Sequence, residues 1–365
     1  MDNSSDETIR FDEMGRCNYC REALDKKPQI YFPNEEGKVK LECLLNEIRE
    51  SSKGKKYDCI MGLSGGLDSS YLAYLGYTWG LRVLAIHIDD GYDSAISKNN
   101  LSNLLKATGF DYETIKPDAN QFNALTKAYM KAGVPNIAIP QDNVLFAFLY
   151  DCVKKYGIKY FLSGSNYAFE SILQRGNTYA PTDIVNIKDI HRRFGSAPID
   201  RLKFTSTLQK LLDVKLHGIE TVTPLNLIDY NRDRAFKELR DFCGFEYYGR
   251  KHLENKLTEF IQLYWFYKKF RVDKRASHLS SMIVSDQMTR DQAMAEYSLP
   301  IYDDEKMREC IELVKHNLQI SDLEFDEIMN APTHQHTEYK TEDETMYYKF
   351  FKALVGLKKL LIPRQ

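Results

Sequence analysis

The feature that most constrains the fold is a glycine-rich turn between a buried apolar run and a helical pattern. The run YDCIMGL (57–63) is short and apolar, as expected of a buried strand. The segment SSYLAYLGYTWG (69–80) has the composition of a helix that ends at glycine. Between them stands the turn SGGLD (64–68). A strand that enters a helix through such a turn indicates a parallel α/β unit.

The same alternation of strand and helix continues along the chain. Further strands are predicted at 82–89, 111–118 and 158–166, and helices at 94–109, 121–133 and 141–157. Parallel strands joined by helices require right-handed crossovers. The sequence therefore predicts an α/β doubly wound parallel sheet, in a nucleotide-binding domain over residues 55–170.

Two other regions flank this unit. Residues 1–54 form an N-terminal Cys-x-x-Cys segment, with a helix at 41–50 and a polar linker at 51–56. Residues 171–365 form a mostly helical region for substrate or partner binding, in which 200–225 is ambiguous. Its helices are predicted at 232–244, 253–270, 289–298, 303–317, 321–330 (with a capping box of Ser321 and Glu324) and 344–361.

The last of these helices, 344–361, is basic and amphipathic. A role at a membrane surface and packing against its own domain both fit this pattern, and the second is favoured. No apolar run approaches about 18 residues, so no stable membrane insertion is expected.

Composition excludes several classes of protein. The chain of 365 residues is 43% hydrophobic and 28% charged, as in soluble enzymes, and its net charge of −2 argues against a nucleic-acid polycation. The N-terminus is polar and acidic, unlike a signal peptide. Seven cysteines are too few for a disulfide scaffold in a chain of this length. A cytoplasmic enzyme is expected, with no nucleic-acid partner.

The turn at 64–68 has the chemistry of a phosphate-binding loop. A helix N-terminus offers free N–H groups, glycines allow close approach, and the hydroxyls of Ser64 and Ser69 add donors. Asp68 would repel phosphate unless a cation intervened, which implies Mg²⁺. The turn is neither a Walker A loop nor a dinucleotide fingerprint. The alternative is an ordinary glycine-rich turn between a strand and a helix.

The motif SGGLDS resembles the pyrophosphate loop of the N-type ATP pyrophosphatases. The resemblance implies an adenine-nucleotide α-hydrolase-like fold, in which ATP is cleaved between its α and β phosphates. AMP is then placed on a carbonyl oxygen, and a nitrogen or sulfur nucleophile displaces it. By the same resemblance, three groups of residues would bind ATP: the loop (Ser64, Gly65, Gly66, Asp68, Ser69, Ser70), the end of the second strand (His87, Ile88, Asp89), and the second turn (Gly164, Ser165).

Longer stretches resemble one narrower family, the N-acetyl sugar amidotransferases of O-antigen and flagellar-glycan biosynthesis. They include HIDDGYDSAISKNNLSNLLKATGFD, PQDNVLFAFLY, SGSNYAFESIL and DKRASHLSSMIVSDQMTRDQAMAEYSLPIYD. The resemblance implies conversion of an acetamido group on a nucleotide-linked sugar to an acetamidino group. It also implies that ammonia comes from partners, a glutaminase and a cyclase-like subunit similar to those of imidazole glycerol phosphate synthase.

A basic segment after residue 249 supplies the remaining candidates. The predicted catalytic residues are Asp68, Lys251, Glu254, Lys274 and Arg275, and the predicted substrate-binding residues are Asn166, Glu170, His252 and His278. Lys and Arg suit phosphate or carboxylate groups, and Glu254 or a histidine could take a proton from attacking ammonia. The alternative is a solvated helix face above a stripe of core aromatic residues.

Cys17 and Cys20 have the spacing of half a zinc site. Zn²⁺ therefore joins ATP and Mg²⁺ among the expected cofactors, with three alternatives for these cysteines. Either the metal site is incomplete, or further ligands come from other parts of the protein, or the natural chain begins upstream of Met1.

Two other functions stay open. One is a tRNA 2-thiolation enzyme of the same superfamily, which would use the interleaved aromatic residues of the basic segment to stack RNA bases. The other is a non-catalytic module that senses ATP. The Mg²⁺-positioning role expected of Asp68 suits hydrolysis better than retention of ATP.

Overall fold

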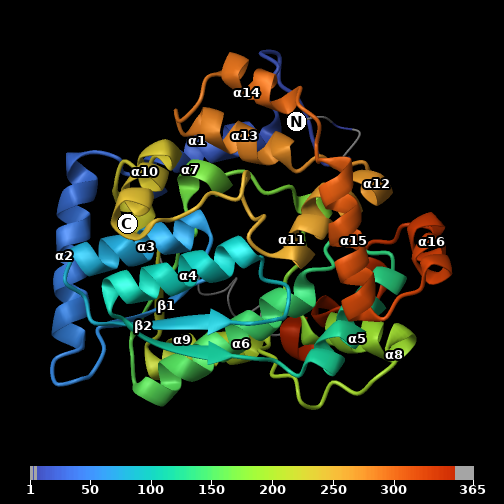
Figure 1. Ribbon diagram of the computed structural model, residues 1–365, viewed down its shortest axis with the longest axis horizontal. Helices are drawn as coiled ribbons and strands as arrows, with labels where there is room; N and C mark the ends of the chain where they lie inside the picture. Colours follow the sequence, from blue (N-terminus) through green and yellow to red (C-terminus); the bar gives the residue numbers. More distant parts are fainter. Residues whose placement is uncertain (1–2, 4–5, 350–365) are drawn as a thin grey trace.

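The computed structural model describes residue 3 and residues 6–349, and its centre is a five-stranded sheet. All neighbouring strands are parallel, in the order β3-β2-β1-β4-β5. The strands are β1 (Cys59–Gly62), β2 (Val83–Ile88), β3 (Asp111–Ile115), β4 (Tyr160–Leu162) and β5 (Glu220–Val222). The doubly wound parallel sheet predicted from the sequence is confirmed (Figure 1).

Helices precede, connect and follow the strands. Before β1 lie α1 (Asn18–Ile30) and α2 (Glu35–Ser51). Between β1 and β5 lie α3 (Leu67–Thr78), α4 (Ala95–Thr108), α5 (Ala119–Lys131), α6 (Ile139–Tyr156), α7 (Tyr167–Glu170), α8 (Ile184–Phe194) and α9 (Thr207–His217). After β5 lie α10 (Arg232–Cys243), α11 (Lys256–Phe260), α12 (Phe266–Phe270), α13 (Arg275–Val284), α14 (Arg290–Tyr297), α15 (Asp304–Leu318) and α16 (Asp322–Asn330).

Both faces of the sheet are covered by helices. Successive residues of a strand point to opposite faces, so β1 contributes side chains to two different cores. Cys59 and Met61 of β1 join a core with α1, α2 and α3, whereas Ile60 joins another with α6. A third core lies beyond the sheet and gathers α5, α8, α11, α15 and α16, at the right of Figure 1. The mostly helical region therefore has a hydrophobic core of its own.

The structure has one strand more than the sequence indicated. β5 lies inside the ambiguous region 200–225 and pairs with β4 at the edge of the sheet. Its residues Glu220 and Thr221 are exposed and polar, so the sequence has no apolar run that would indicate a strand there. Helices α1, α7, α8, α9 and α13 were also not predicted.

Two predicted details are corrected. The helix expected at 253–270 is not uniform, since a π-helical turn (Ile261–Trp265) separates α11 from α12. Ser321 caps α16 as predicted, but the capping box does not form. The carboxylate of Glu324 instead pairs with Lys127 and Lys131, both at 2.8 Å.

Three further predictions concern the segment 51–56, the helix 344–361 and membrane insertion. The segment 51–56 is not a loose linker, because Ser52 is buried and bonds to Asp58. Helix 344–361 lies partly outside the described residues, and its described part has helical backbone at 346–349. Within residues 6–349, no helix is long and apolar enough to cross a membrane.

Candidate active site

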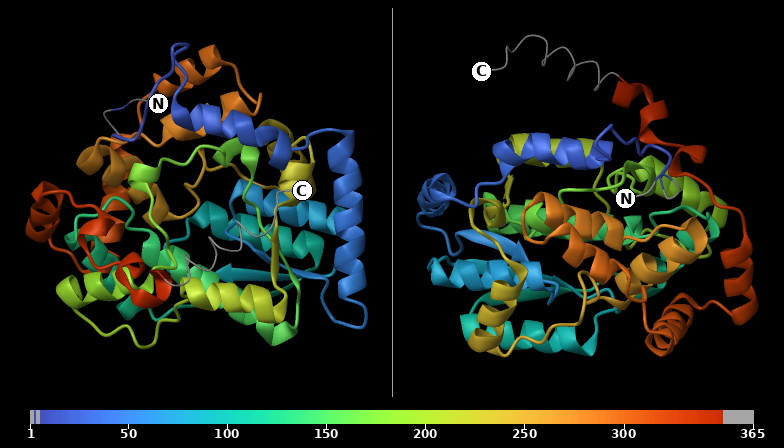
Figure 2. Two further views of the ribbon diagram at one scale, coloured as in Figure 1. Left: turned by 180° about the vertical axis from the view of Figure 1, so that it is seen from behind. Right: turned by 90° about the horizontal axis from the view of Figure 1, so that it is seen from above.

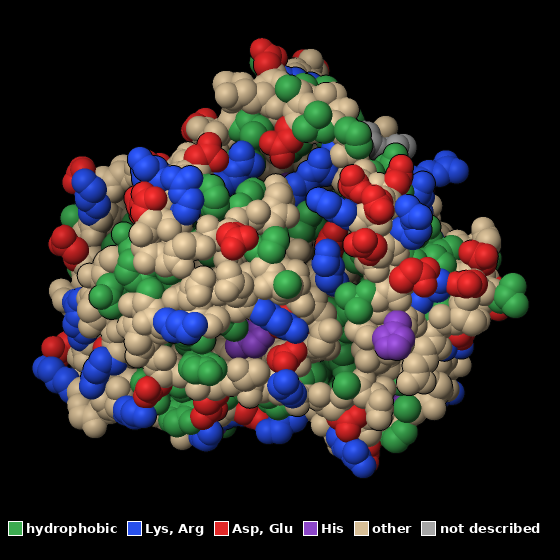
Figure 3. All heavy atoms as spheres, in the orientation of Figure 1, with side chains coloured by type: hydrophobic (Ala, Val, Ile, Leu, Met, Phe, Trp, Pro, Cys, Tyr) green, Lys and Arg blue, Asp and Glu red, His purple; other side chains and the backbone are tan. Residues whose placement is uncertain are grey.

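A cavity of about 620 Å³ opens at the carboxyl ends of β1, β2 and β4. The chain leaves β1 toward β2 on one side, and β4 lies on the other side, so the strand order reverses between β1 and β4. Ligands of doubly wound sheets bind at such a point. The volume also falls in the usual range for a small-molecule site. On the face shown in Figure 3, Lys and Arg side chains are interspersed with Asp and Glu.

The glycine-rich turn lies in the wall of this cavity. Gly65 has a positive φ of 77°, and a Cβ there would lie 2.4 Å from the backbone oxygen of Ser97. Gly66 is the N-cap of α3 and offers no side chain. The second turn packs directly on this helix start, since a Cβ on Gly164 would lie 3.2 Å from the backbone nitrogen of Ser69. Glycine is therefore required at position 65, whereas a side chain at position 164 would crowd the start of α3.

The donors of the turn face oxygen atoms in this structure. The backbone nitrogen of Leu67 donates to the hydroxyl of Tyr248 at 2.8 Å, and that of Gly66 donates to Ser64 Oγ at 3.2 Å. Tyr248 lines the cavity beside the loop. Both donors are therefore occupied by protein hydroxyls in this structure, and a bound phosphate would have to replace these hydroxyls as the acceptor.

Asp68 lies in a compact group of charged and hydroxyl side chains. Lys251 Nζ is 2.6 Å from Asp68 Oδ2 and 3.0 Å from Glu170 Oε1, and the hydroxyl of Tyr230 donates to Asp68 Oδ1. Burial alone would lower the pKa of Lys251, but the two carboxylates outweigh it and raise that pKa. Lys251 is therefore charged, and one ammonium faces two carboxylates.

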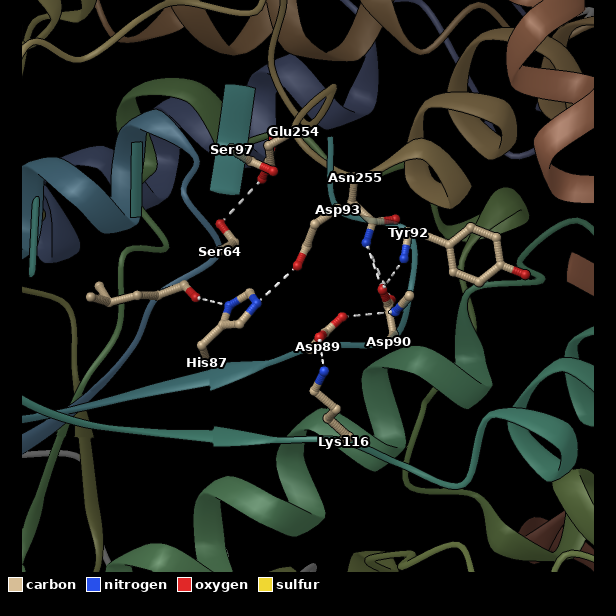
Figure 4. Close-up of polar contacts among 12 residues, drawn as sticks. Ser64, His87, Asp89, Asp90, Tyr92, Asp93, Ser97, Lys116, Glu254 and Asn255 are labelled. Carbon is tan, nitrogen blue, oxygen red and sulfur yellow. Dashed lines mark hydrogen bonds and ion pairs between the residues drawn. The ribbon is translucent and has the colours of Figure 1, made fainter. Parts of the chain in front are cut away.

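Glu254 places its carboxylate against the glycine-rich turn. Its Oε1 is 3.3 Å from Ser64 Oγ, and a Cβ on Gly66 would come within 2.6 Å of it (Figure 4). Its backbone oxygen accepts from the nitrogen of Ser94, which fixes the segment to the start of α4. Among the described residues, Oε2 of Glu254 is buried without a hydrogen-bond partner.

His87 is held on both sides (Figure 4). Its Nδ1 is 2.7 Å from the backbone oxygen of Leu63, and its Nε2 is 2.8 Å from Asp93 Oδ2. Since both neighbours accept hydrogen bonds, the ring fits best as an imidazolium. Burial opposes that charge, but the bonds to Asp93 and Leu63 prevail and raise the pKa of His87. His87 thus ties β1 to the loop after β2, and both its nitrogens are occupied.

The basic segment contributes a second group of titratable side chains. Lys274 is 9% exposed, and its Nζ lies 5.1 Å from the ring centre of Phe266. No carboxylate within the described residues pairs with it, and burial lowers the pKa of Lys274 to about 8. Burial also lowers the pKa of His252 and of His278, whose rings lie 5.6 Å apart. His252 has a positive φ of 65°, which is strained for a residue other than glycine.

Two carboxylates that line the cavity, Asp90 and Asp142, were not predicted. Asp90 is buried and accepts from Gln141, Asn255 and the backbone of Tyr92 (Figure 4). Asp142 also lines the cavity, and burial raises its pKa to about 7. Sequence offered one signal for these residues, because both lie in stretches, HIDDGYD and PQDNV, that carry the family resemblance.

Most of the predicted site residues come together here. The cavity is lined by Ser64, Gly66, Asp68, Ser69, His87, Ile88, Gly164, Ser165, Glu170, Lys251, His252, Glu254, Lys274, Arg275 and His278. Tyr230 and Tyr248 were missed. Tyr248 could have been found, since it directly precedes the basic segment.

Several predicted site residues, whether or not they line the cavity, are held by partners within the protein. Arg275 binds both oxygens of Asp273 and donates to the backbone oxygen of Leu299. Asn166 caps α7, and Asp89 pairs with Lys116 at 2.8 Å. Ser70 is fully buried.

Cys17 and Cys20 lie at the start of α1, outside the residues that line the cavity. Their sulfur atoms are 3.3 Å apart, and this contact lowers the pKa of the Cys17 thiol. No group of three or more His, Cys, Asp or Glu in the described part of the chain is arranged to hold a metal. A zinc site at these cysteines is therefore not shown.

The residues beside the loop fit a magnesium ion that is shared with phosphates. Mg²⁺ at nucleotide sites is typically held by one or two carboxylates, with substrate phosphates as further ligands. Asp68 and Glu254 are the carboxylates beside the loop. Both oxygens of Asp68 are occupied by Lys251 and Tyr230, whereas the buried Oε2 of Glu254 has no partner in the described structure. A magnesium ion there would neutralise phosphate charge.

A comparison with protein families matches the C-terminal part of the chain. Residues 254–355 match the C-terminal domain of WbpG-like lipopolysaccharide (LPS) biosynthesis proteins. The matched region begins at Glu254 and includes Lys274 and His278, so it supplies part of the cavity wall. It does not include the glycine-rich turn. No curated protein matches the chain.

Three solved structures are distantly similar to the chain. NMN synthetase from Francisella tularensis is 13% identical, with 78% of this chain and 97% of that chain covered and a TM-score of 0.38. NH3-dependent NAD synthetase from Campylobacter jejuni is 13% identical, with coverage of 82% and 98% and a TM-score of 0.34. The U34-tRNA thiolase NcsA from Methanococcus maripaludis is 12% identical, with coverage of 71% and 81% and a TM-score of 0.33. Likenesses this distant carry no information on function.

Proposed function

We propose that the chain is an ATP-dependent amidotransferase that converts the acetamido group of a nucleotide-linked sugar to an acetamidino group. One observation carries the proposal. The region that matches an LPS biosynthesis domain begins at Glu254, and this residue contacts Ser64 of the glycine-rich turn. The glycine-rich turn, to which we assign phosphate binding, and the region similar to an LPS biosynthesis domain therefore line one cavity.

The proposed reaction begins at the amide oxygen of the acetamido group. This oxygen attacks the α-phosphorus of ATP, and pyrophosphate leaves from the loop. Ammonia then adds to the activated carbon, AMP departs with the oxygen, and one proton is lost. The donors at the start of α3 suit the departing pyrophosphate, because its negative charge lies at a helix N-terminus.

The chain's own residues provide the proton transfers. Glu254 contacts Ser64 of the loop, and either Glu254 or a histidine accepts the proton from the attacking ammonia, the histidine if Glu254 holds magnesium. Neutral His252 and His278 could relay it, since burial keeps both rings uncharged. We assign to Lys274 the role of pairing with an anionic group on the sugar nucleotide. Ammonia would come from a glutaminase with a cyclase-like partner.

The test uses the purified protein with ATP, ammonium and a UDP-linked diacetamido uronic acid. We expect AMP and pyrophosphate to form only with the sugar, together with the small mass decrease that replacement of O by NH produces. AMP release stimulated by tRNA instead would assign the protein to tRNA thiolation. Tight ATP binding without turnover under all these conditions would assign it to ATP sensing.

A further inference from the structure

One side of the cavity carries two carboxyl groups that no basic side chain neutralises. Asp90 is 7% exposed, and its carboxylate accepts from the amide of Asn255 at 3.0 Å and from the amide of Gln141. Asp142 follows Gln141 directly and lines the same cavity. Within the described residues, neither Asp90 nor Asp142 pairs with a lysine, an arginine or a histidine. We call these two carboxyl groups the acidic side of the cavity.

The first turn of α6 is fixed on both sides of Asp142. Asn143 is fully buried and exchanges two hydrogen bonds with the backbone of Thr205, at 2.8 and 3.0 Å. Gln141 bonds to Asp90, and its Oε1 accepts from the hydroxyl of Thr258 on α11 at 3.5 Å. Asp142 therefore sits in a rigid turn between two residues whose side chains are both engaged.

The carboxylate of Asp142 has no such partner. No hydrogen bond or ion pair to its side chain forms within the part of the chain that the structure describes, and burial alone raises the pKa of Asp142 to about 7. An enclosed carboxylate without a partner costs free energy. Since the side chain faces the cavity and holds nothing in the fold together, it is free to bind a ligand there.

Hydrogen bonds connect the acidic side to the glycine-rich turn. Asn255, which bonds to Asp90, directly follows Glu254, and Glu254 contacts Ser64 (Figure 4). In Figure 1 and in the left view of Figure 2, the strands end on the side of the molecule where α15 and α16 lie (orange and red). The bond between Thr258 and Gln141 joins the start of α6 to α11 at this end of the sheet.

The two unpaired groups of the cavity suit ligands of opposite charge. Lys274 has no carboxylate partner within the described residues, and we have assigned it to an anionic group of the sugar nucleotide. An unpaired carboxylate calls instead for a cation that can donate hydrogen bonds. The reaction proposed above has one reactant of that kind, because ammonia is mostly protonated at neutral pH.

We propose that Asp142 binds an ammonium ion in the cavity and accepts its first proton. Ammonium has no free electron pair and cannot attack carbon. Transfer breaks one N–H bond and forms an O–H bond on Asp142, and the electron pair stays on the nitrogen of the ammonia that forms. Ammonia then attacks, and the second proton goes to Glu254 or a histidine as described above. Asp142 returns its proton to water before the next turnover. This inference rests on the proposed function.

Binding of ammonium is measured first, without turnover. We expect ammonium chloride to raise the melting temperature of the wild type by about 2 °C or more over sodium chloride at equal concentration. Asp142→Asn should lose this difference, whereas Asp151→Asn, on the same helix but outside the cavity lining, should keep it. No difference between the salts in the wild type would overturn the proposal. An equal rise with potassium chloride would also overturn it, by assigning the site to monovalent metal ions.

The proton transfer is tested with two nucleophiles. Hydroxylamine is mostly uncharged at neutral pH, so it needs no base before it attacks. Asp142→Asn should lower kcat/KM about 100-fold for ammonium but only about threefold for hydroxylamine, with KM for ATP unchanged. Asp142→Glu, which keeps a carboxylate, should restore part of the activity with ammonium. Equal losses with both nucleophiles would overturn the proposal. A wild type that forms no sugar-dependent AMP would refute the proposed function instead, and the melting comparison would still decide whether Asp142 binds ammonium.

Discussion

The ammonium of Lys251 lies 2.6 Å from Oδ2 of Asp68, so the basic segment and the glycine-rich turn meet in one ion pair. The two residues are 183 positions apart in the sequence. Their contact brings the start of α3 and the segment before α11 to one point in the cavity. The ion pair therefore links the two parts of the chain that form the candidate site.

Replacement of Asp68 by Asn should abolish turnover while leaving the fold intact. Asn keeps the size of the side chain, and Lys251 retains Glu170 as a partner. We expect AMP formation to fall by about 100-fold or more, the scale of losing one charged group that acts on a transferring phosphoryl group. Asp111→Asn, at the exposed edge strand β3, is the control. Normal AMP formation in Asp68→Asn would refute a role for this carboxylate.

The two glycines of the turn should fail in different ways. Gly65→Ala introduces strain at positive φ and a clash with the backbone of Ser97, so the free energy of unfolding should fall by about 2 kcal/mol or more. Gly66→Ala meets only the ends of the Glu254 and Ser64 side chains, which can move. That variant should melt near the wild-type temperature yet lose AMP formation. Equal melting temperatures for the two variants would contradict this assignment.

His252 combines backbone strain with a side chain in the cavity. His252→Gly relieves the strain, whereas His252→Ala keeps it, so the glycine variant should be more stable by about 1 kcal/mol in urea unfolding. Both variants should lose activity to a similar extent, because both remove the imidazole. Full activity in the glycine variant would show that the ring takes no part in the reaction.

Lys274→Met should stabilise the protein and weaken substrate binding. A buried, unpaired ammonium disfavours folding, so its removal should raise the free energy of unfolding by about 1–2 kcal/mol. In the wild type the pKa of Lys274 is about 8 when folded and higher when unfolded. The unfolded state thus binds more protons above pH 8, and stability should rise with pH there.

The same pKa predicts how substrate binding responds to pH. The charged form of Lys274 predominates below about pH 8, so KM for the sugar nucleotide should increase as pH rises through that value. Lys274→Met should show a high KM with little pH dependence, and kcat should change less. A KM that is insensitive to this substitution would exclude Lys274 from substrate binding.

The pair of His87 and Asp93 should have the opposite effect on stability. The pKa of His87 is raised in the folded state, so its contribution is fully present below the pKa of an unfolded histidine and is lost as pH rises through the folded pKa. Asp93→Asn should flatten this part of the pH profile, because it removes the carboxylate that raises the pKa. Urea unfolding from pH 5.5 upward measures the effect, and identical profiles would contradict it.

The sequence predicted those parts of the fold that depend on local pattern. The apolar runs of β1 and β2, the glycine-rich turn and α3 are contiguous signals, and each forms where it was predicted. β5 could not be predicted, since an exposed edge strand of three residues has no apolar period. The π-helical turn within 253–270 likewise leaves no trace in the helical pattern.

Many residues that line the cavity were predicted from the sequence, but Tyr230, Tyr248, Asp90 and Asp142 were not, and the pairing of the site residues was not. Asp68, Lys251 and Glu254 are recognisable as charged groups near motifs, and the cavity collects them. The bond from Tyr230 to Asp68 joins residues 162 positions apart, and it forms only when the chain after β5 packs against α3. The bonds of His87 to Leu63 and Asp93 are closer in sequence, but they depend on how the loop after β2 packs against the end of β1.

Because the basic segment follows all five strands in the sequence, the ribosome synthesises its site residues after those of the glycine-rich turn. A nascent chain that has emerged as far as residue 230 holds all five strands and the glycine-rich turn, but none of Lys251, His252 and Glu254. Domains commonly fold from the N-terminal side during synthesis. The part of the cavity that the strands and the glycine-rich turn form can therefore take shape while Lys251, His252 and Glu254 are still being made. If the proposed function holds, an unfinished chain would not consume ATP.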